Sequence, residues 1–171
     1  MFKRRVTSQI NIGNVLIGGN AQISVQSMTK TDTRDVKATV NQIDAIAEAG
    51  GDIVRCAVPD MEAAVALKDI VKKSKLPVVA DIHFHYKLAL ESLKNGVDCL
   101  RLNPGNIRDK SKVQEIVKEA KIRQVPIRIG VNFGSLPPVG KIGVFGGLSR
   151  HADKVNELPN RLKLKMVNIL L

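Results

Sequence analysis

Arginine residues stand near the ends of three short apolar runs of this chain. They are Arg55, Arg101 and Arg128. A guanidinium forms paired hydrogen bonds with phosphate oxygens, so arginines that converge on one place are typical of sites for phosphorylated ligands. A fourth apolar run supplies one obvious carboxylate, Asp81. Three guanidiniums facing one carboxylate keep a net positive charge, and the sequence therefore predicts a site for an anion.

Three polar residues share the spacing of these charged groups. His83, Asn103 and Asn132 each follow one of them at an even separation, which places both side chains on the same side of a strand. Asparagine amides can donate to and accept from hydroxyl groups, and a histidine can act in acid-base chemistry or only form hydrogen bonds. We expect all seven residues to bind a ligand that is both anionic and hydroxylated, with Asp81 and His83 as candidate catalytic groups.

The same residues also allow a purely structural interpretation. A charged side chain in the middle of a buried strand has to be paired, so the three arginines could form a network with Asp81 that only stabilises the interior. The excess of arginine over carboxylate favours ligand binding instead. In the first apolar run, Gln26 and Met28 share one face, and the sequence assigns them no role.

The elements that position these residues repeat along the chain. Short β-rich runs alternate with amphipathic stretches at about 25 residues per unit, which predicts parallel strands joined by right-handed helical crossovers. The five predicted strands are Ile23 to Met28, Asp52 to Val58, Pro77 to Ile82, Cys99 to Pro104 and Pro126 to Val131.

Helix-start signals lie between the runs. They predict one helix that opens at Thr33 or Asp35 and ends at Gly50-Gly51, one that opens at Asp60, and one that opens at Asp109 or Ser111 and ends before Pro126. Residues 1–20 precede the repeating units. Within them, Ile10 to Gly19 contains two short apolar runs that Gly13-Asn14 separates, a pattern that predicts a β-hairpin.

A barrel and an open sheet both satisfy this alternation. No Gly-x-Gly-x-x-Gly follows the first strand, so the nucleotide-binding form of the open sheet loses its main support. We therefore predict an α/β fold, a partial (β/α)₈ TIM barrel of about five of the eight units, spanning residues 1–138. Residues 139–171 form a basic tail of different character, and we expect the chain to be truncated before the barrel closes.

Composition limits the classes of function. The chain has 171 residues, 44% hydrophobic content and only 3% aromatics, which suits a core of aliphatic residues such as parallel sheets use. The formal net charge of +11 permits polyanionic ligands, but nucleic acid is a weak alternative because the chain has few aromatics and no nucleic-acid module. Cys56 and Cys99 form no metal-binding or disulfide pattern, and no run is long enough to span a membrane, so we expect a cytoplasmic protein.

Several longer motifs occur in order along residues 4–138. The chain resembles the barrel domain of the 4-hydroxy-3-methylbut-2-enyl diphosphate synthase family through these motifs together. They are Val25-Gln26-Ser27-Met28-Thr29, Asp52-Ile53-Val54-Arg55, Ala80-Asp81-Ile82-His83-Phe84, Arg101-Leu102-Asn103-Pro104-Gly105-Asn106 and Pro126-Ile127-Arg128-Ile129-Gly130-Val131-Asn132.

The resemblance implies an oxidoreductase of isoprenoid biosynthesis. Its substrate would be 2-C-methyl-D-erythritol 2,4-cyclodiphosphate, whose ring is opened reductively with loss of water. Two electrons would come from ferredoxin or flavodoxin through a [4Fe-4S] cluster, and the complete enzyme would be a homodimer. By motif match, Arg55, Arg101 and Arg128 would clamp the diphosphate, and Asp81, His83, Asn103 and Asn132 would contact the rest of the substrate.

Two departures from the family pattern qualify this expectation. His85-Tyr86-Lys87 stands where the family has Asp-Tyr-Arg, and nothing after about Gly140 matches. The family's cluster ligands, three cysteines and a glutamate, lie in a C-terminal domain that has no counterpart here, and Cys56 and Cys99 lie within predicted strands. We expect no metal ligands in this chain and no turnover by the chain alone. The alternatives are a pterin-binding barrel of the dihydropteroate synthase type and a non-catalytic diphosphate-binding module.

Overall fold

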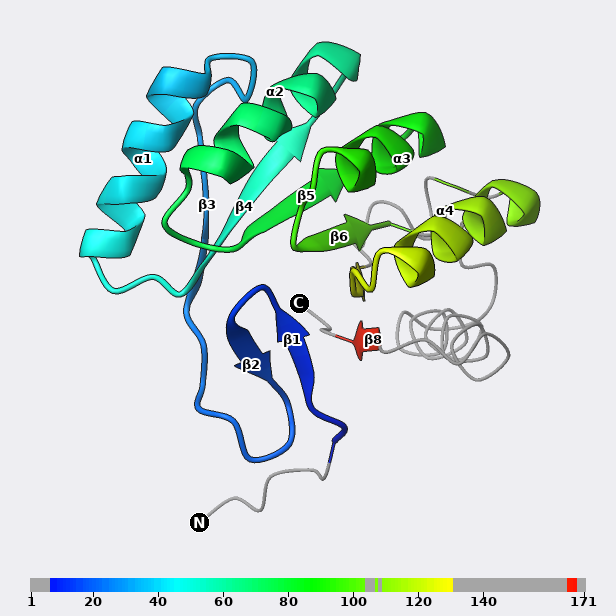
Figure 1. Ribbon diagram of the computed structural model, residues 1–171, viewed down its shortest axis with the longest axis horizontal. Helices are drawn as coiled ribbons and strands as arrows, with labels where there is room; N and C mark the ends of the chain where they lie inside the picture. The colour runs from blue at the N-terminus through cyan, green and yellow to red at the C-terminus, as the bar shows by residue number, and fades with distance from the viewer. Residues whose placement is uncertain (1–6, 104–106, 108, 131–165, 169–171) are drawn as a thin grey trace, which may run out of the picture.

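The structure is a computed structural model that describes residues 7–103, 107, 109–130 and 166–168. It contains a two-stranded antiparallel hairpin and a parallel sheet of six strands in the order β3-β4-β5-β6-β7-β8 (Figure 1). The hairpin consists of β1 (Ile10–Ile12) and β2 (Val15–Ile17). The sheet consists of β3 (Gln26–Met28), β4 (Ile53–Val58), β5 (Val78–Ile82), β6 (Cys99–Leu102), β7 (Ile127–Ile129) and β8 (Met166–Asn168).

The five predicted strands and the hairpin are confirmed, with shorter bounds. β5 and β7 begin one residue after Pro77 and Pro126, because proline has no N–H to donate to a strand ladder. A further strand, β8, pairs in parallel with β7 beyond the five predicted strands.

Four helices follow successive strands: α1 (Val36–Glu48), α2 (Met61–Lys73), α3 (Tyr86–Lys94) and α4 (Lys110–Ile122). Asp35, Asp60 and Asp109 are the N-caps of α1, α2 and α4, each accepting a hydrogen bond from a backbone N–H of the first turn. Of the two predicted openings of α1, Asp35 is therefore the N-cap. Thr33 does not cap the helix; its hydroxyl donates a hydrogen bond to the carbonyl oxygen of Ala57 at 2.7 Å.

Alternate residues of each strand enter two different clusters. On the outer face, Val54, Cys56 and Val58 of β4 are fully buried with side chains of the four helices, and the corresponding residues of β5 and β6 join them. On the inner face, Ile53, Val79 and Cys99, one from each of β4, β5 and β6, pack against the hairpin. This alternation is what a barrel requires, with helices outside and a filled interior.

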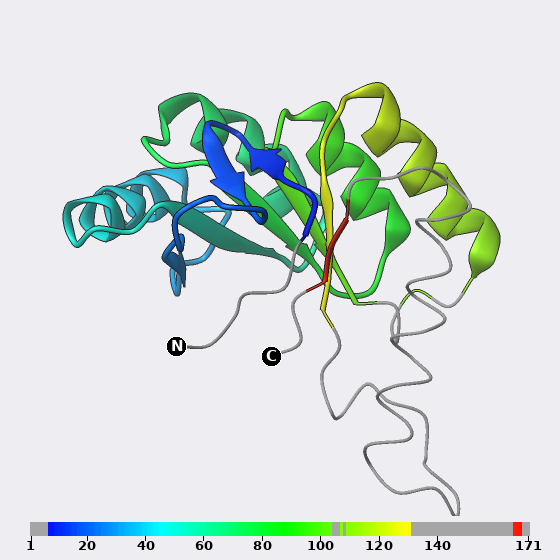
Figure 2. The same cartoon turned by 90° about the horizontal axis from the view of Figure 1, so that it is seen from below.

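The hairpin closes the interior at the N-terminal ends of the strands (Figure 2). Ile12 is fully buried against Ile53, Val79 and Cys99, which all lie near the beginnings of their strands. At the turn, Gly13 has a φ of +56°, and a Cβ there would lie 2.9 Å from both Asp98 and Pro77. The turn thus needs glycine twice over, for its left-handed backbone and for the close approach. The opposite, C-terminal end of the strands is left for the polar side chains.

One long-range hydrogen bond shows that the sheet is curved. Arg128 of β7 donates through Nη1 to Oε1 of Gln26 on β3, although three strands lie between them in the sheet order. A flat sheet would separate these strands by about four spacings of 4.8 Å, too far for the two side chains to meet. The sheet therefore bends around an interior, as in a partial TIM barrel. Among the described residues, no helix has both the length and the apolar character needed to cross a membrane.

Candidate anion-binding site

The centre of the candidate site is the carboxylate of Asp81, which is 2% exposed at the C-terminal half of β5. Its Oδ1 accepts from Arg101 Nη1 at 3.0 Å, and its Oδ2 lies 3.4 Å from Arg55 Nε. Asp81 and Arg101 are register partners, and Arg101 and Arg128 are register partners in turn. The structure therefore brings the three predicted arginines together from β4, β6 and β7 around one carboxylate.

Arg128 is the least compensated member of this group. Its side chain is buried, its Nε has no hydrogen-bond partner, and no carboxylate among the described residues lies within 4.0 Å of its guanidinium. Burial lowers the pKa of Arg128, and the nearby guanidiniums of Arg55 and Arg101 lower it further. Among the described residues, Asp81 is the carboxylate that pairs with these arginines, and Arg128 is left with a positive charge that an anionic ligand would neutralise.

Two uncharged residues of β3 support the arginines, Met28 from the strand next to β4 and Gln26 from across the interior. Met28 Sδ lies 3.1 Å from Arg55 Nη2 and 3.3 Å from its Nε, and Gln26 accepts from Arg128. Both side chains point inward, as their shared face in the sequence indicated. They hold the guanidiniums without adding negative charge, so the surplus of positive charge persists. The sequence did not reveal these roles, because the Met28–Arg55 contact depends on the register of β3 against β4 and the Gln26–Arg128 contact depends on the curvature of the sheet.

The predicted polar residues have different surroundings. His83 follows β5, is 40% exposed in its side chain, and its Nε2 lies 3.5 Å from Asp81 Oδ2. Asn103 follows β6 and is buried next to the arginines' strand ends. Asn132 lies outside the described residues. The site thus combines a buried cationic floor with a half-exposed imidazole, a group that can exchange protons with a ligand or donate a hydrogen bond to it.

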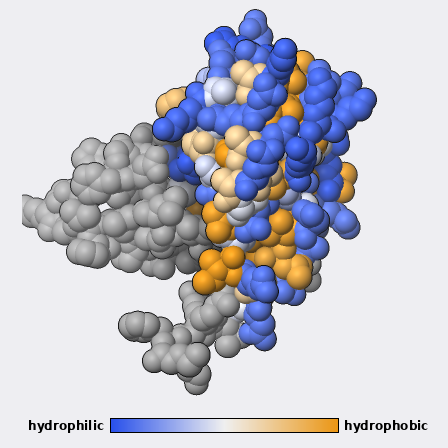
Figure 3. Space-filling model, turned by 90° about the vertical axis from the view of Figure 1, so that its left-hand side faces the viewer, coloured by the Kyte–Doolittle hydropathy of each residue, from blue (hydrophilic) through white to orange (hydrophobic). Residues whose placement is uncertain are grey.

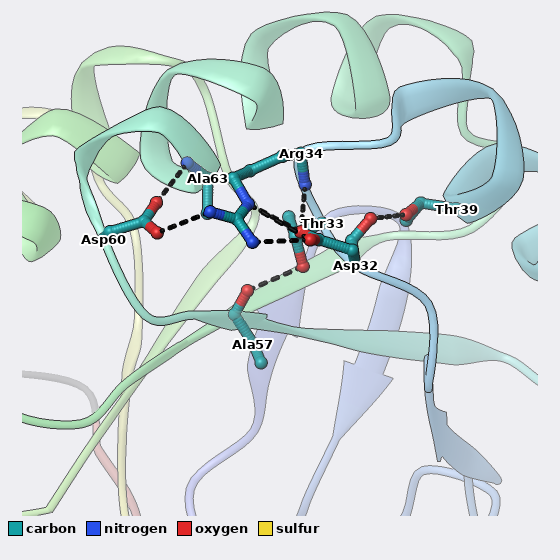
Figure 4. Close-up of polar contacts among 7 residues, drawn as sticks. All are labelled: Asp32, Thr33, Arg34, Thr39, Ala57, Asp60 and Ala63. Carbon is teal, nitrogen blue, oxygen red and sulfur yellow. Dashed lines mark hydrogen bonds and ion pairs between the residues drawn. The ribbon is translucent and has the colours of Figure 1, made fainter.

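The rim of the site includes an arginine of a different kind. Arg34, in the loop between β3 and α1, reaches Asp32 at 2.7 Å and Asp60 at 3.3 Å, so it joins two neighbouring loops (Figure 4). Arg34 lowers the pKa of Asp32 to about 2 through a side-chain hydrogen bond. With two carboxylates at hand, Arg34 carries no surplus charge. It fixes the loops and serves as a comparison for the three buried arginines.

Neither cysteine fits a role as a metal ligand. Cys56 and Cys99 are free and buried, on opposite faces of the sheet. Burial raises the pKa of both thiols, for Cys99 to about 12, whereas metal binding uses the thiolate. Within the ranges that the structure describes, no group of three or more His, Cys, Asp or Glu side chains could hold a metal ion. The described residues therefore do not fit an iron-sulfur cluster.

Comparison with known families decides what kind of barrel this is. The model of the GcpE TIM-barrel domain matches residues 7–142, which is most of the chain and includes every arginine of the site. This chain belongs to the GcpE family. Membership agrees with the resemblance found in the sequence motifs and with the curved parallel sheet.

Curated relatives of the GcpE family share more than half of the aligned residues with this chain. The proteins named 4-hydroxy-3-methylbut-2-en-1-yl diphosphate synthase (flavodoxin) from Dehalococcoides mccartyi and Clostridium perfringens are 62% identical over 137 residues and 56% identical over 135 residues. The alignments cover 80% and 79% of this chain, but only 39% of each relative. The chain thus spans about two fifths of the length of these relatives.

Solved structures confirm the fold of this GcpE-family chain at much lower identity. Dihydropteroate synthase from Xanthomonas albilineans superposes with a TM-score of 0.70 at 11% identity, covering 94% of this chain and 63% of that protein. Phospho-2-dehydro-3-deoxyheptonate aldolase from Thermotoga maritima gives a TM-score of 0.61 at 12% identity, covering 94% and 44%. At such identities the likeness concerns the fold alone, so it gives no support to a pterin-binding function.

Proposed function

We propose that this GcpE-family chain forms the substrate-binding part of a 4-hydroxy-3-methylbut-2-en-1-yl diphosphate synthase. The observation that carries the proposal is the buried charge of Arg128 beside Arg55 and Arg101, with no carboxylate of the described residues paired to it. The ligand would be 2-C-methyl-D-erythritol 2,4-cyclodiphosphate, which offers a diphosphate to the arginines and hydroxyl groups to His83, Asn103 and Asn132. The names of the relatives support this assignment.

In the proposed reaction, the cyclic diphosphate takes up two electrons and two protons and yields the linear diphosphate and water. The residues of this chain would hold the diphosphate while the ring opens, because guanidiniums stabilise the negative charge that develops on the released oxygen. Asp81 keeps two of these guanidiniums in place. His83, half-exposed beside Asp81, is the candidate for moving a proton to or from the substrate.

The electrons would reach the substrate through a [4Fe-4S] cluster of the complete enzyme, with flavodoxin as the reductant that the relatives' names indicate. Since the described residues of this chain do not fit the cluster, we assign it no ligand here. The described part would bind the cyclodiphosphate without reducing it, which is the behaviour of a diphosphate-binding module. Free thiols in this chain suit a cytoplasmic location, where thiols stay reduced.

Calorimetric titration of the cyclodiphosphate into wild type, Arg101→Lys and Arg101→Ala tests the proposal. Lysine keeps the charge but loses the paired hydrogen bonds of the guanidinium, so we expect Arg101→Lys to weaken binding by about 1 to 3 kcal/mol. Arg101→Ala should cost at least as much. Arg34→Lys is the matched control, since Arg34 is already neutralised by two carboxylates and should leave the affinity unchanged.

Unchanged affinity in both Arg101 variants, with the fold intact by circular dichroism, would contradict the proposal. The arginines and Asp81 would then be better described as a structural network. Equal losses in Arg101→Lys and Arg34→Lys would also contradict it, because they would indicate a general effect of net charge rather than a specific clamp.

A further inference from the structure

The position after β7 is occupied by a glycine that touches the guanidinium of Arg101. Gly130 donates its N–H to the carbonyl oxygen of Leu102 at 3.0 Å, and its own carbonyl oxygen accepts from Arg101 Nη2 at 3.4 Å. A Cβ at Gly130 would lie 2.7 Å from Arg101 Nε, 3.0 Å from Nη2 and 3.3 Å from Cζ. The guanidinium thus lies directly on the backbone of residue 130.

Space, and not backbone conformation, is what requires glycine here. Glycines 13, 18, 19, 50 and 96 have positive φ angles, but Gly130 is outside that group, so an alanine could adopt its backbone conformation. Three atoms of Arg101 fill the volume that the methyl group would need. With a side chain at residue 130, the guanidinium would have to move.

Moving that guanidinium disturbs the centre of the site. Arg101 is 5% exposed, and Asp81 Oδ1 holds its Nη1 at 3.0 Å. The guanidinium is therefore fixed between a carboxylate on β5 and the backbone of residue 130 after β7. If the guanidinium moved far enough to make room for a Cβ at residue 130, its hydrogen bond to Asp81 would lengthen. Its N–H groups would also point in a different direction.

We propose that Gly130 is a positioning residue that sets the orientation of the Arg101 guanidinium for the bound diphosphate. This inference rests on the proposed function and deepens it. Gly130 acts only through Arg101, so its replacement weakens anion binding while the barrel stays folded, because the atoms that must yield are the end of a flexible side chain.

A double-mutant cycle for binding tests the inference. We expect Gly130→Ala to weaken cyclodiphosphate binding about tenfold or more, as a lost pair of charge-assisted hydrogen bonds would. In the Arg101→Ala background, the same substitution should change affinity less than about twofold, because the group through which Gly130 acts is gone. A tenfold loss in both backgrounds would overturn the inference.

A measurement without ligand separates this inference from the proposed function. In ¹⁵N–¹H spectra, the Nε–Hε signal of Arg101 is identified by its disappearance in Arg101→Ala, and we expect Gly130→Ala to shift it. An unmoved signal would overturn the positioning role. If wild type bound neither cyclodiphosphate nor inorganic pyrophosphate, the proposed function would fail, and the Arg101 signal would still decide the role of Gly130.

The fold itself provides a second readout. If Gly130→Ala prevents folding through its clash with Arg101, the double variant Gly130→Ala with Arg101→Ala should fold, since the clashing group is absent. Failure of both variants to fold would show that residue 130 needs glycine for its backbone, and this would overturn the inference.

Discussion

Arg128 donates a hydrogen bond to Gln26, a neutral acceptor, where a carboxylate could stand. At the scale of single residues, this choice of partner determines whether the site keeps charge for a ligand. A hydrogen bond to a charged group stabilises a fold more than a hydrogen bond to a neutral group, so a carboxylate at position 26 would stabilise the fold more than glutamine does and would also neutralise Arg128. The same reasoning applies to Met28, whose sulfur supports Arg55 without neutralising it.

Gln26→Glu should therefore change stability and binding in opposite directions. We expect a gain of about 1 kcal/mol in the free energy of unfolding at pH 7, because a charged acceptor replaces a neutral one, and an affinity for cyclodiphosphate at least about tenfold lower. Arg128 would depress the pKa of the introduced carboxyl. The gain should thus be present at neutral pH and disappear as the pH falls through that depressed value.

Urea unfolding at several pH values and calorimetric titration measure the two effects. Gln22→Glu is the control. Gln22 is exposed in the same segment, and its replacement by glutamate changes the net charge by the same amount. If both variants lost affinity equally, the loss would reflect overall charge, and Gln26 would have no specific part in keeping Arg128 uncompensated.

At the scale of elements, the loops at the C-terminal ends of the strands are tied to one another and to the helices. Asp60 caps α2 by accepting from the N–H of Ala63 at 2.9 Å, and it also lies 3.3 Å from Arg34. The capping bond is local and was predictable from sequence, because aspartate ahead of an apolar helical pattern is a start signal. The ion pair with Arg34 links segments 26 residues apart and required the structure.

Asp60→Ala should lower the free energy of unfolding by about 1 kcal/mol, the usual effect of removing an N-cap. Asp60→Asn is the matched variant, since asparagine still accepts from Ala63 but no longer pairs with Arg34. An exposed ion pair contributes little, so we expect a loss of about 0.5 kcal/mol or less for asparagine. Urea denaturation measures both, and a larger loss for asparagine than for alanine would contradict the capping role.

At the scale of the whole molecule, β3 is an edge strand of the sheet, and no other strand of the described residues pairs with its outer side. Ile23 and Val25, which lead into this strand, are 83% and 56% exposed. The side of the molecule that carries α1 and β3 shows hydrophobic surface beside hydrophilic helix faces (Figure 3). An exposed parallel edge flanked by apolar side chains is a site at which chains associate.

We expect the chain to self-associate at micromolar concentration. Self-association should be weaker when Ile23 and Val25 are both replaced by lysine. Lysine beside an edge strand opposes pairing through charge repulsion. Ile122→Lys is the control, because Ile122 is 67% exposed at the end of α4, away from this edge. Sedimentation velocity over a range of concentrations gives the result, and a wild type that stays a compact monomer would contradict the expectation.

The sequence by itself determined the hairpin, the alternation of strands and helices, the candidate N-caps and the inward position of Arg55, Asp81, Arg101 and Arg128. These features follow from local rules: a period of two along strands, apolar periodicity along helices and the chemistry of capping residues. The arginines, Asp81, His83 and Asn103 were found in this way, and the motifs that contain them led to the family that the comparison confirmed.

Only the tertiary structure decided which of these residues meet. Gln26 contacts Arg128 across 102 residues of sequence, Gly130 supports Arg101 across 29, and β8 adds a strand that no local pattern revealed. Such contacts depend on how strongly the sheet bends and on how neighbouring strands are staggered, and both quantities arise from packing of the helices and the hairpin against the whole sheet. The period of a strand fixes the side to which a residue points, but the curvature of the sheet fixes the partner that it finds there.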